Sequence, residues 1–193
     1  MDSIVLKDRI TTRMTDEEFF WFCQENKDLR IERNDKLEIV IMAPVYTLGG
    51  YRNGEVVRQL ANWAVEDGTG LVFDSSTGFT LNDRSVRCPD AAWVSLAKWN
   101  QIPESERERF AAVCPEFIIE IRSASDSLGD LRQKCLFWLQ NGAALVWLID
   151  PKEKQTHVYR ADKNPEVIKG FKGLIAGEGP VRGFELDLSL LRI

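Results

Sequence analysis

The strongest pattern of hydrophobic and polar positions lies between residues 115 and 151, which read PEFIIEIRSASDSLGDLRQKCLFWLQNGAALVWLIDP. Two mostly apolar runs, 117–121 and 145–150, predict buried strands. Between them, apolar residues recur at the spacing of one helix face: Leu128, Leu131, Cys135, Trp138 and Leu139. This spacing predicts a helix with one apolar face. Ser127 is placed to begin that helix and Gly142 to end it. The segment therefore predicts a strand–helix–strand unit with two parallel strands and a right-handed crossover.

The rest of the chain alternates between shorter helical and strand-like segments. An N-terminal helix over 15–26 should be followed by a β-hairpin made of residues 29–34 and 37–42. A loop at 43–50 then leads into a second helix, whose inner face carries Val56, Val57, Leu60, Trp63 and Ala64. Further strands are expected at 71–73, 78–81, 91–94 and 156–159, and near residues 167 and 184. These elements predict one α/β domain over residues 1–193, with a mixed central sheet flanked by helices.

Composition and charge change this picture little. The chain has 193 residues, of which 44% are hydrophobic and 28% charged, as in an ordinary globular protein. Its net charge of −5 does not by itself indicate nucleic-acid binding, although 25 Lys and Arg residues can still form a local basic patch. We expect a cytoplasmic protein with no membrane partner, because neither a membrane-spanning run nor a signal-peptide core is found. The four cysteines form no CxxC pair and there is one histidine, so reduced thiols are expected and a zinc site is not.

Three polar residues stand out because of where they fall in these elements. Asp90 follows Pro89 at the start of a strand, and Glu120 lies in the strand predicted to be buried. Lys134 lies on the flank of the helix's apolar face, so its removal should spare folding. Carboxylates from adjacent strands make an oxygen site suited to Mg²⁺, and a nearby lysine can orient a water or stabilise phosphate oxygens. Structural ion pairs cluster in the same way, so the residues alone leave open a purely structural pairing with Arg122 or Lys134.

The motifs around these residues resemble a known family. Pro89-Asp90, followed thirty residues later by EIR at 120–122, resembles the PD-(D/E)XK signature of restriction-endonuclease-like nucleases. More narrowly, several segments resemble a large bacterial family of predicted endonucleases within that superfamily. These segments are RCPDAAWVSLAKW, CPEFIIEIRSASDSL, LRQK, ALVWLIDP, IERN, LEIVIMAP and VFDSSTGF. These segments cover most of residues 28–160. The resemblance implies a restriction-endonuclease-like core, with the N-terminal helix and hairpin added to it. It also implies hydrolysis of DNA phosphodiester bonds with Mg²⁺ or Mn²⁺.

The resemblance also implies roles for individual residues. Asp90 and Glu120 would hold the metal ion, and Lys134 would position the attacking water from the helix. Arg122 stands where the superfamily usually has lysine; arginine keeps its proton, so it would bind phosphate instead. Glu32 matches an acid in the family's first hairpin, although its side chain could equally face solvent.

The role of Asn53, two alternative functions and the oligomeric state remain to be considered. Asn53 lies on the inner side of the second helix, either as a helix-start amide bonded to backbone or as a phosphate contact. The main alternative function is a catalytically inactive nucleic-acid-binding or accessory protein on the same fold. Another is hydrolysis of a different phosphate ester. A chain with one site cuts one DNA strand, so cutting both strands of a duplex needs two chains. We therefore predict a homodimer.

Overall fold

The structure is a computed structural model that describes residues 3–7 and 13–192. Its helical elements are α1 (Asp16–Glu25), α2 (Thr47–Asp67), α3 (Leu96–Trp99), α4 (Glu104–Arg107), α5 (Leu128–Gln140), η2 (Gly179–Val181) and η3 (Leu188–Leu191). The strands are β1 (Ser3–Leu6), β2 (Arg30–Arg33), β3 (Ile39–Met42), β4 (Gly70–Asp74), β5 (Phe79–Thr80), β6 (Val86–Arg87), β7 (Ala91–Ser95), β8 (Phe117–Ile121), β9 (Leu145–Asp150), β10 (Gln155–Arg160), β11 (Glu166–Lys169), β12 (Leu174–Ala176) and β13 (Glu185–Asp187).

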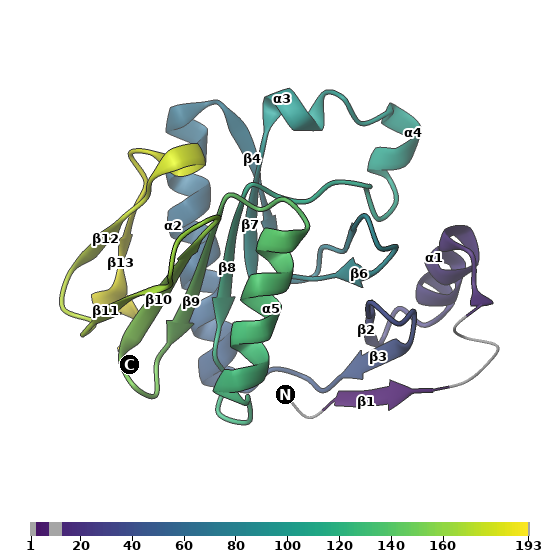
Figure 1. The fold of residues 1–193 in the computed structure, drawn as a ribbon, viewed down its shortest axis with the longest axis horizontal. Helices are drawn as coiled ribbons and strands as arrows, with labels where there is room; N and C mark the ends of the chain where they lie inside the picture. The colour runs from purple at the N-terminus through teal and green to yellow at the C-terminus, as the bar shows by residue number, and fades with distance from the viewer. Residues whose placement is uncertain (1–2, 8–12, 193) are drawn as a thin grey trace.

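A six-stranded sheet in the order β11-β10-β9-β8-β7-β4 forms the centre of the molecule (Figure 1). Strands β8 and β9 are parallel, and the other neighbours in this sheet are antiparallel. The predicted strand–helix–strand unit is confirmed, with strand bounds as expected. The Ser127 side chain accepts a hydrogen bond from the backbone N–H of Asp130 at the start of α5. Gly142 follows the end of the helix with a φ of 108°, a conformation in which a side chain would be strained. The mixed sheet flanked by helices confirms the α/β fold class.

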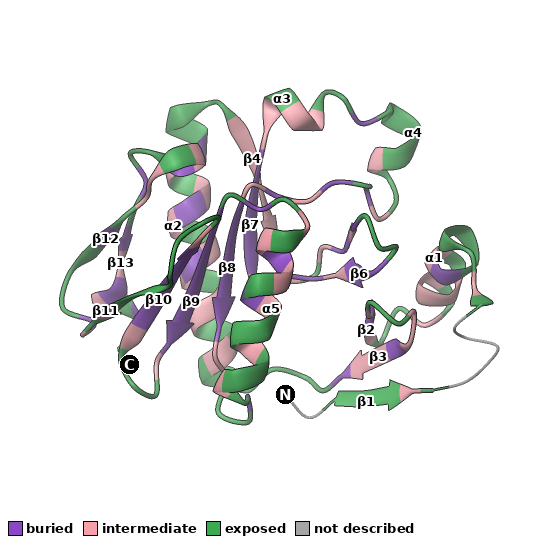
Figure 2. Cartoon of the chain, viewed as in Figure 1, coloured by how far each residue is buried: buried purple, intermediate pink, exposed green. Residues whose placement is uncertain are grey.

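Helices α2 and α5 cover opposite faces of this sheet. The central strands β8 and β9 are buried along their whole length (Figure 2). Their side chains point alternately to the two faces of the sheet, which separates two cores. Under α2, Val56 and Leu60 pack against the strand residues Phe117, Ile119 and Trp147. Under α5, the helix residues Cys135 and Trp138 pack against Ala92, Ile118, Val146 and Leu148. Because Glu120 follows Ile118 by two positions in β8, its side chain lies on the α5 face.

The predicted hairpin belongs to a second sheet. Strands β2 and β3 pair antiparallel, as expected, within a five-stranded sheet ordered β1-β3-β2-β6-β5. Strands β1 and β6 were not predicted from the sequence. The second of these is only two residues long, which is too short to carry a periodic signal. The hairpin extends to one side of the central sheet, beyond α5, as Figure 1 shows.

The expected loop over residues 43–50 is shorter than predicted, because α2 begins at Thr47. Gly49 and Gly50 lie within this helix in spite of the low helix propensity of glycine. A Cβ atom on Gly49 would lie 2.7 Å from Cγ1 of Val45. A side chain at this position would require the exposed Val45 side chain to move, and the helix continues through Gly49.

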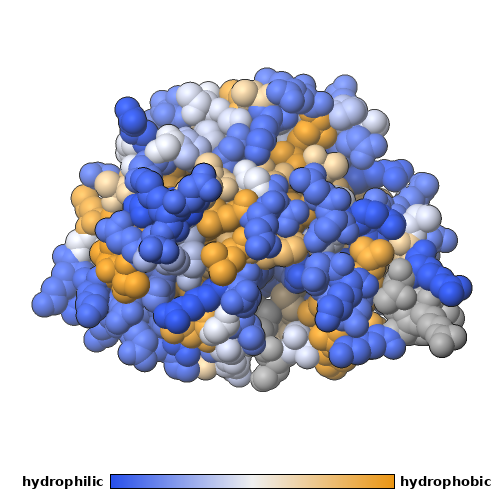
Figure 3. All heavy atoms as spheres, in the orientation of Figure 1, coloured by the Kyte–Doolittle hydropathy of each residue, from blue (hydrophilic) through white to orange (hydrophobic). Residues whose placement is uncertain are grey.

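The outer surface is mostly hydrophilic on the face shown in Figure 3, with apolar side chains in small groups. In the described part of the chain, no helix is long and apolar enough to cross a membrane. All four cysteines are free thiols, in agreement with the sequence prediction.

Candidate active site

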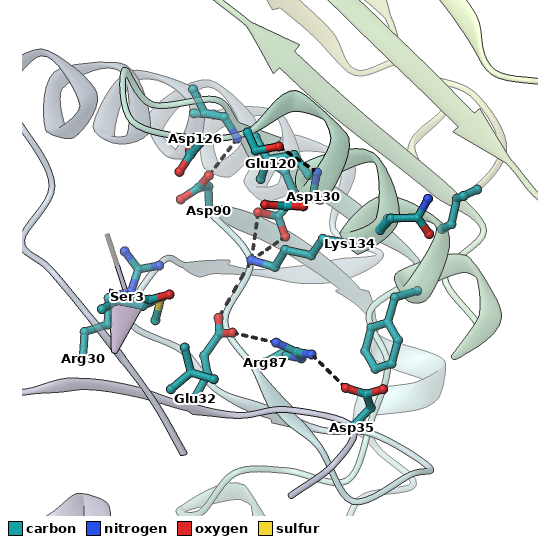
Figure 4. Close-up of a pocket in the computed structure, with 18 of the residues that line it drawn as sticks. Ser3, Arg30, Glu32, Asp35, Arg87, Asp90, Glu120, Asp126, Asp130 and Lys134 are labelled. Carbon is teal, nitrogen blue, oxygen red and sulfur yellow. Dashed lines mark hydrogen bonds and ion pairs between the residues drawn. The ribbon is translucent and has the colours of Figure 1, made fainter. Parts of the chain in front are cut away.

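A pocket of about 480 Å³ opens between α5, the β2–β3 hairpin and the ends of β7 and β8 (Figure 4). Four of the six residues predicted for the site line it: Glu32, Asp90, Glu120 and Lys134. The volume falls within the range of small-molecule and cofactor sites. The fold therefore brings together residues that are as far apart as 32 and 134 in the chain.

The strand register brings Asp90 and Glu120 together. In the antiparallel ladder between β7 and β8, Ala91 is paired with Ile119. Continuing this register by one residue sets Asp90 opposite Glu120, and side chains on opposite residues of two strands are close neighbours. The Oδ2 atom of Asp90 accepts a 2.7 Å hydrogen bond from the backbone N–H of Ile121. Its Oδ1 accepts one of 3.1 Å from the side-chain amide of Asn53.

Glu120 is held by two side chains of α5. It is 2% exposed, and its Oε1 accepts a 2.8 Å hydrogen bond from Nε1 of Trp138. The ammonium of Lys134 lies 3.0 Å from the same carboxylate and donates a hydrogen bond to Oε2. Trp138 and Lys134 are four residues apart, so they lie one above the other on the helix. One turn of α5 therefore supplies both donors to Glu120.

Glu32 enters the pocket from β2 and is 3% exposed. From the sequence this side chain could equally have faced solvent, and the structure shows that it does not. Its Oε1 accepts a 3.0 Å hydrogen bond from the backbone N–H of Cys88 and lies 3.8 Å from Nζ of Lys134. Its Oε2 lies 3.2 Å from Nη1 of Arg87. Lys134 thus lies between two buried carboxylates, so its removal would leave both of them short of positive charge.

These contacts shift the protonation of the site. Burial raises the pKa of Glu120 to about 7, against the opposing charge of Lys134 and with a further rise from Asp90. Burial also raises the pKa of Asp90. For Lys134, burial alone would lower the pKa, but Glu120, Glu32 and Asp90 outweigh it and raise the pKa above its usual value. Burial would raise the pKa of Glu32, yet the charges of Lys134 and Arg87 hold it below its usual value. The lysine therefore stays charged, whereas Asp90 and Glu120 resist ionisation.

Two predicted site residues do not line the pocket. Nη1 of Arg122 forms a 2.7 Å ion pair with the fully buried Asp150 at the end of β9, and its Nε donates to the backbone carbonyl of Asp126. Asn53 lies well inside α2, so the expectation of a helix-start amide bonded to backbone is wrong. Its amide contacts Asp90 instead. The phosphate contacts predicted for Arg122 and Asn53 are not seen in this arrangement and stay predictions.

Sequence reasoning missed the role of Trp138. It predicted this residue to lie in the core, and the side chain is indeed fully buried. The hydrogen bond from its indole N–H to Glu120 was not foreseen. The signal available in the sequence was the four-residue spacing between Lys134 and Trp138, which sets both on the helix face that packs over the strand.

The charges around the pocket suit a divalent cation. Six lining residues are acidic: Glu32, Asp35, Asp90, Glu120, Asp126 and Asp130. Three are basic: Arg30, Arg87 and Lys134. Among the described residues, no group of three or more His, Cys, Asp and Glu side chains is arranged to hold a metal ion. Mg²⁺ is commonly bound through one or two carboxylates, with water and substrate phosphates completing its shell. Asp90 and Glu120 fit that donor set. A carboxylate offers about four acceptor sites, and the hydrogen bonds that Asp90 and Glu120 accept leave some of these sites open.

Comparison with known proteins gives a family match and a structural match. The model of the Uma2 family, described as "Putative restriction endonuclease", matches residues 16–189. A crystal structure titled as a "putative nuclease belonging to DUF820", from Anabaena variabilis ATCC 29413, superposes with a TM-score of 0.72. The two sequences are 22% identical, and the match covers 93% of this chain and 97% of that one. At this identity the superposition shows a shared fold. No curated protein matches the chain.

Proposed function

The chain belongs to the Uma2 family, and from this premise we propose that it is a metal-dependent endonuclease that hydrolyses DNA phosphodiester bonds. The observation that carries the proposal is the meeting of Asp90, Glu120 and Lys134 in one pocket. Two carboxylates with raised pKa values, one buried and one half-buried, next to a charged lysine, form an arrangement that is costly for folding alone. A catalytic use for these groups accounts for that cost.

Asp90 and Glu120 would hold Mg²⁺ or Mn²⁺. When bound, such an ion lowers the pKa of a water molecule and offsets the negative charge on a phosphate under attack. The two carboxylates are well fixed for this task. Asn53 and the backbone of Ile121 hold Asp90, and Trp138 holds Glu120. Each carboxylate therefore keeps one orientation without any movement on substrate binding.

Lys134 would supply hydrogen bonds and positive charge to the attacking water and the phosphate oxygens. Its raised pKa means that Nζ keeps its three protons at working pH. It would thus act as a donor and a charge rather than as a base. Glu32 holds Lys134 from the side opposite to Glu120, which keeps the ammonium within the pocket.

Cleavage of a labelled DNA duplex with Mg²⁺ or Mn²⁺ tests the proposal. The parent should cut the DNA, and Asp90→Asn and Glu120→Gln should lose at least a hundredfold in rate, since each removes a ligand charge. A parent that binds DNA in a salt-dependent way without cutting it, with or without metal, would instead support an inactive binding or accessory protein. Cleavage of nucleotides or other phosphate esters but not of DNA would support the third reading.

We also propose that the active form is a homodimer. A single site acts on one strand, so cutting both strands at one position calls for two sites related by the two-fold symmetry of the duplex. Light scattering that shows a monomer at concentrations where double-strand cleavage is intact would contradict this proposal.

A further inference from the structure

Arg30 is the first residue of β2 and lines the pocket beside the carboxylates. In β2 it lies two positions before Glu32, so both side chains project from the same face of the strand. Figure 4 shows Arg30 and Lys134 entering the pocket from opposite sides, with Asp90 near Arg30. Its positive charge acts on Asp90, since it counters the rise in the pKa of that carboxyl.

The guanidinium of Arg30 has no partner among the residues that the structure describes. Its Nε is buried without a hydrogen bond, and no ion pair or hydrogen bond to its other nitrogens is found within residues 3–7 and 13–192. The nearby arginines are paired. The Nε of Arg87 is likewise buried without a hydrogen bond, but its other nitrogens pair with Glu32 and approach Asp35, and Arg122 pairs with Asp150.

An unsatisfied buried donor costs about 1–3 kcal/mol, and native proteins satisfy nearly all such groups. Arginine cannot escape this cost by losing its proton. A hydrogen-bond acceptor on a bound ligand would satisfy the N–H groups of Arg30. A phosphate is the acceptor that best matches a free guanidinium, because the planar fork of N–H groups binds two phosphate oxygens at once.

Arg30 also borders a second pocket, of about 460 Å³, whose lining includes Lys27, Ser75 and Ser76. The first pocket lies on the face of β2 that carries Arg30 and Glu32, and the second is lined by Ile31 from the other face, so Arg30 lies at the boundary between the two. A phosphate bound by its guanidinium would therefore lie at the rim of the catalytic pocket.

We propose that Arg30, rather than Arg122, binds a backbone phosphate of the DNA next to the one being cleaved. The inference rests on the proposed function, because it assigns a residue to the substrate of the same site. Arg30 and Lys134 then hold the DNA strand from two sides, in front of Asp90 and Glu120. The strand enters along the face of β2 that carries Arg30 and Glu32.

The test compares Arg30→Ala, Arg30→Gln and Arg30→Lys with the parent. Binding of a labelled duplex is followed by fluorescence anisotropy with Ca²⁺ over a range of salt concentrations, and single-turnover cleavage is followed with Mg²⁺. The control is Arg182→Ala, which removes the same charge from an exposed side chain that lines neither pocket. Thermal unfolding should show that the alanine and glutamine variants are folded, because no protein partner of Arg30 is lost.

Arg30→Ala and Arg30→Gln should weaken DNA binding by about tenfold or more, and should reduce the slope of log affinity against log salt by about one. Arg30→Lys should recover part of the affinity through its charge, while cleavage stays slow for lack of the planar fork. Arg182→Ala should match the parent. Parent-like binding and cleavage by Arg30→Ala would overturn the assignment while leaving the proposed function intact. A parent that binds no DNA would overturn both.

Discussion

The indole N–H of Trp138 donates a 2.8 Å hydrogen bond to Oε1 of Glu120. Trp138 is fully buried under the central sheet, so this bond joins the core under α5 to the candidate active site. Lys134 contacts the same carboxylate from one helical turn away. Trp138, which packs α5 onto the sheet, thereby also fixes the orientation of the Glu120 carboxylate.

Replacing Trp138 with Phe should keep an aromatic ring in the core but remove the donor to Glu120. The cleavage rate at saturating DNA should fall at least tenfold, because a hydrogen bond to a charged group contributes about 1.5–3 kcal/mol. The bond lowers the pKa of Glu120, so its loss should move the rise of the rate–pH profile to higher pH. Single-turnover cleavage from pH 6 to pH 9 measures both effects.

Trp147→Phe is the matched control for this change. Trp147 is also buried in the central sheet, and its Nε1 has no hydrogen-bond partner in the described part of the chain. Both variants should lose similar packing energy in urea unfolding, but the control should keep the parental rate and pH profile. Equal losses of rate in the two variants would show that Trp138 acts through packing alone.

Asn53→Ala should weaken the hold on Asp90 while leaving in place both carboxylates that are proposed to bind the metal ion. The variant loses the 3.1 Å bond to Oδ1, so more Mg²⁺ should be needed for half-maximal cleavage, by about tenfold. Gln59→Ala serves as the control, because Gln59 lies on the same helix and bonds to Asp187 instead. It should lower stability without changing the metal requirement. An unchanged Mg²⁺ titration for Asn53→Ala would contradict a positioning role.

The central part of the fold could be predicted because its signals are local. Between residues 115 and 151, strand and helix periods alternate, and Ser127 and Gly142 mark the ends of the helix between them. The second sheet could not be predicted in full. Its strands β1 and β6 depend on partners distant in sequence, and the pairing of β6 with β2 involves a single residue pair, Arg33 with Val86.

The candidate site was predicted where a motif or a periodicity pointed to it. Asp90, Glu120 and Lys134 fall together as expected. Arg122 was assigned from its place after Glu120, but the sequence holds no sign that Asp150 would take up its charge. Arg30 could have been found from its two-residue spacing to Glu32. Its lack of a protein partner is a property of the packed structure, which no local pattern reports.

Metal-free protein should lose stability as pH rises from about 4.5 to about 7. The pKa of Glu120 rises from an ordinary value of 4.5 to about 7 in the folded chain. Between these values the folded state binds more protons than the unfolded state, so stability falls with rising pH. Each pKa unit corresponds to about 1.4 kcal/mol, so the loss is roughly 3 kcal/mol at most. Urea unfolding in EDTA at several pH values measures it.

Glu120→Gln removes this titration and should flatten the stability–pH curve. The remaining slope comes from Asp90, whose pKa is raised as well, and from His157, whose pKa is lowered by burial and which acts in the opposite direction. Saturating Mg²⁺ should also oppose the loss in the parent, since a bound cation favours the ionised carboxylates. An equally steep curve for Glu120→Gln would place the titrating group elsewhere in the chain.

Lys134→Ala should affect both folding and turnover. The ammonium lies 3.0 Å from Glu120 and 3.8 Å from Glu32, so its loss leaves the buried Glu120 without its cation and leaves Glu32 with Arg87 alone. This differs from the expectation, drawn from the helix flank alone, that its removal spares folding. Unfolding free energy without metal should drop by about 1–3 kcal/mol, less than for a fully buried pair because the lysine side chain is 21% exposed. Mg²⁺ should restore part of this loss.

Under conditions where circular dichroism shows a folded variant, single-turnover cleavage by Lys134→Ala should be slower by about a hundredfold or more. This is the usual effect of losing a preorganised charge contact. Arg122→Lys provides the contrast, because it keeps a positive charge beside Asp150, outside the pocket. It should lower stability modestly and leave turnover close to that of the parent. If Lys134→Ala cuts as fast as the parent while Arg122→Lys is inactive, then the roles of the two residues are reversed, and the catalytic cation is the one that directly follows the acidic strand.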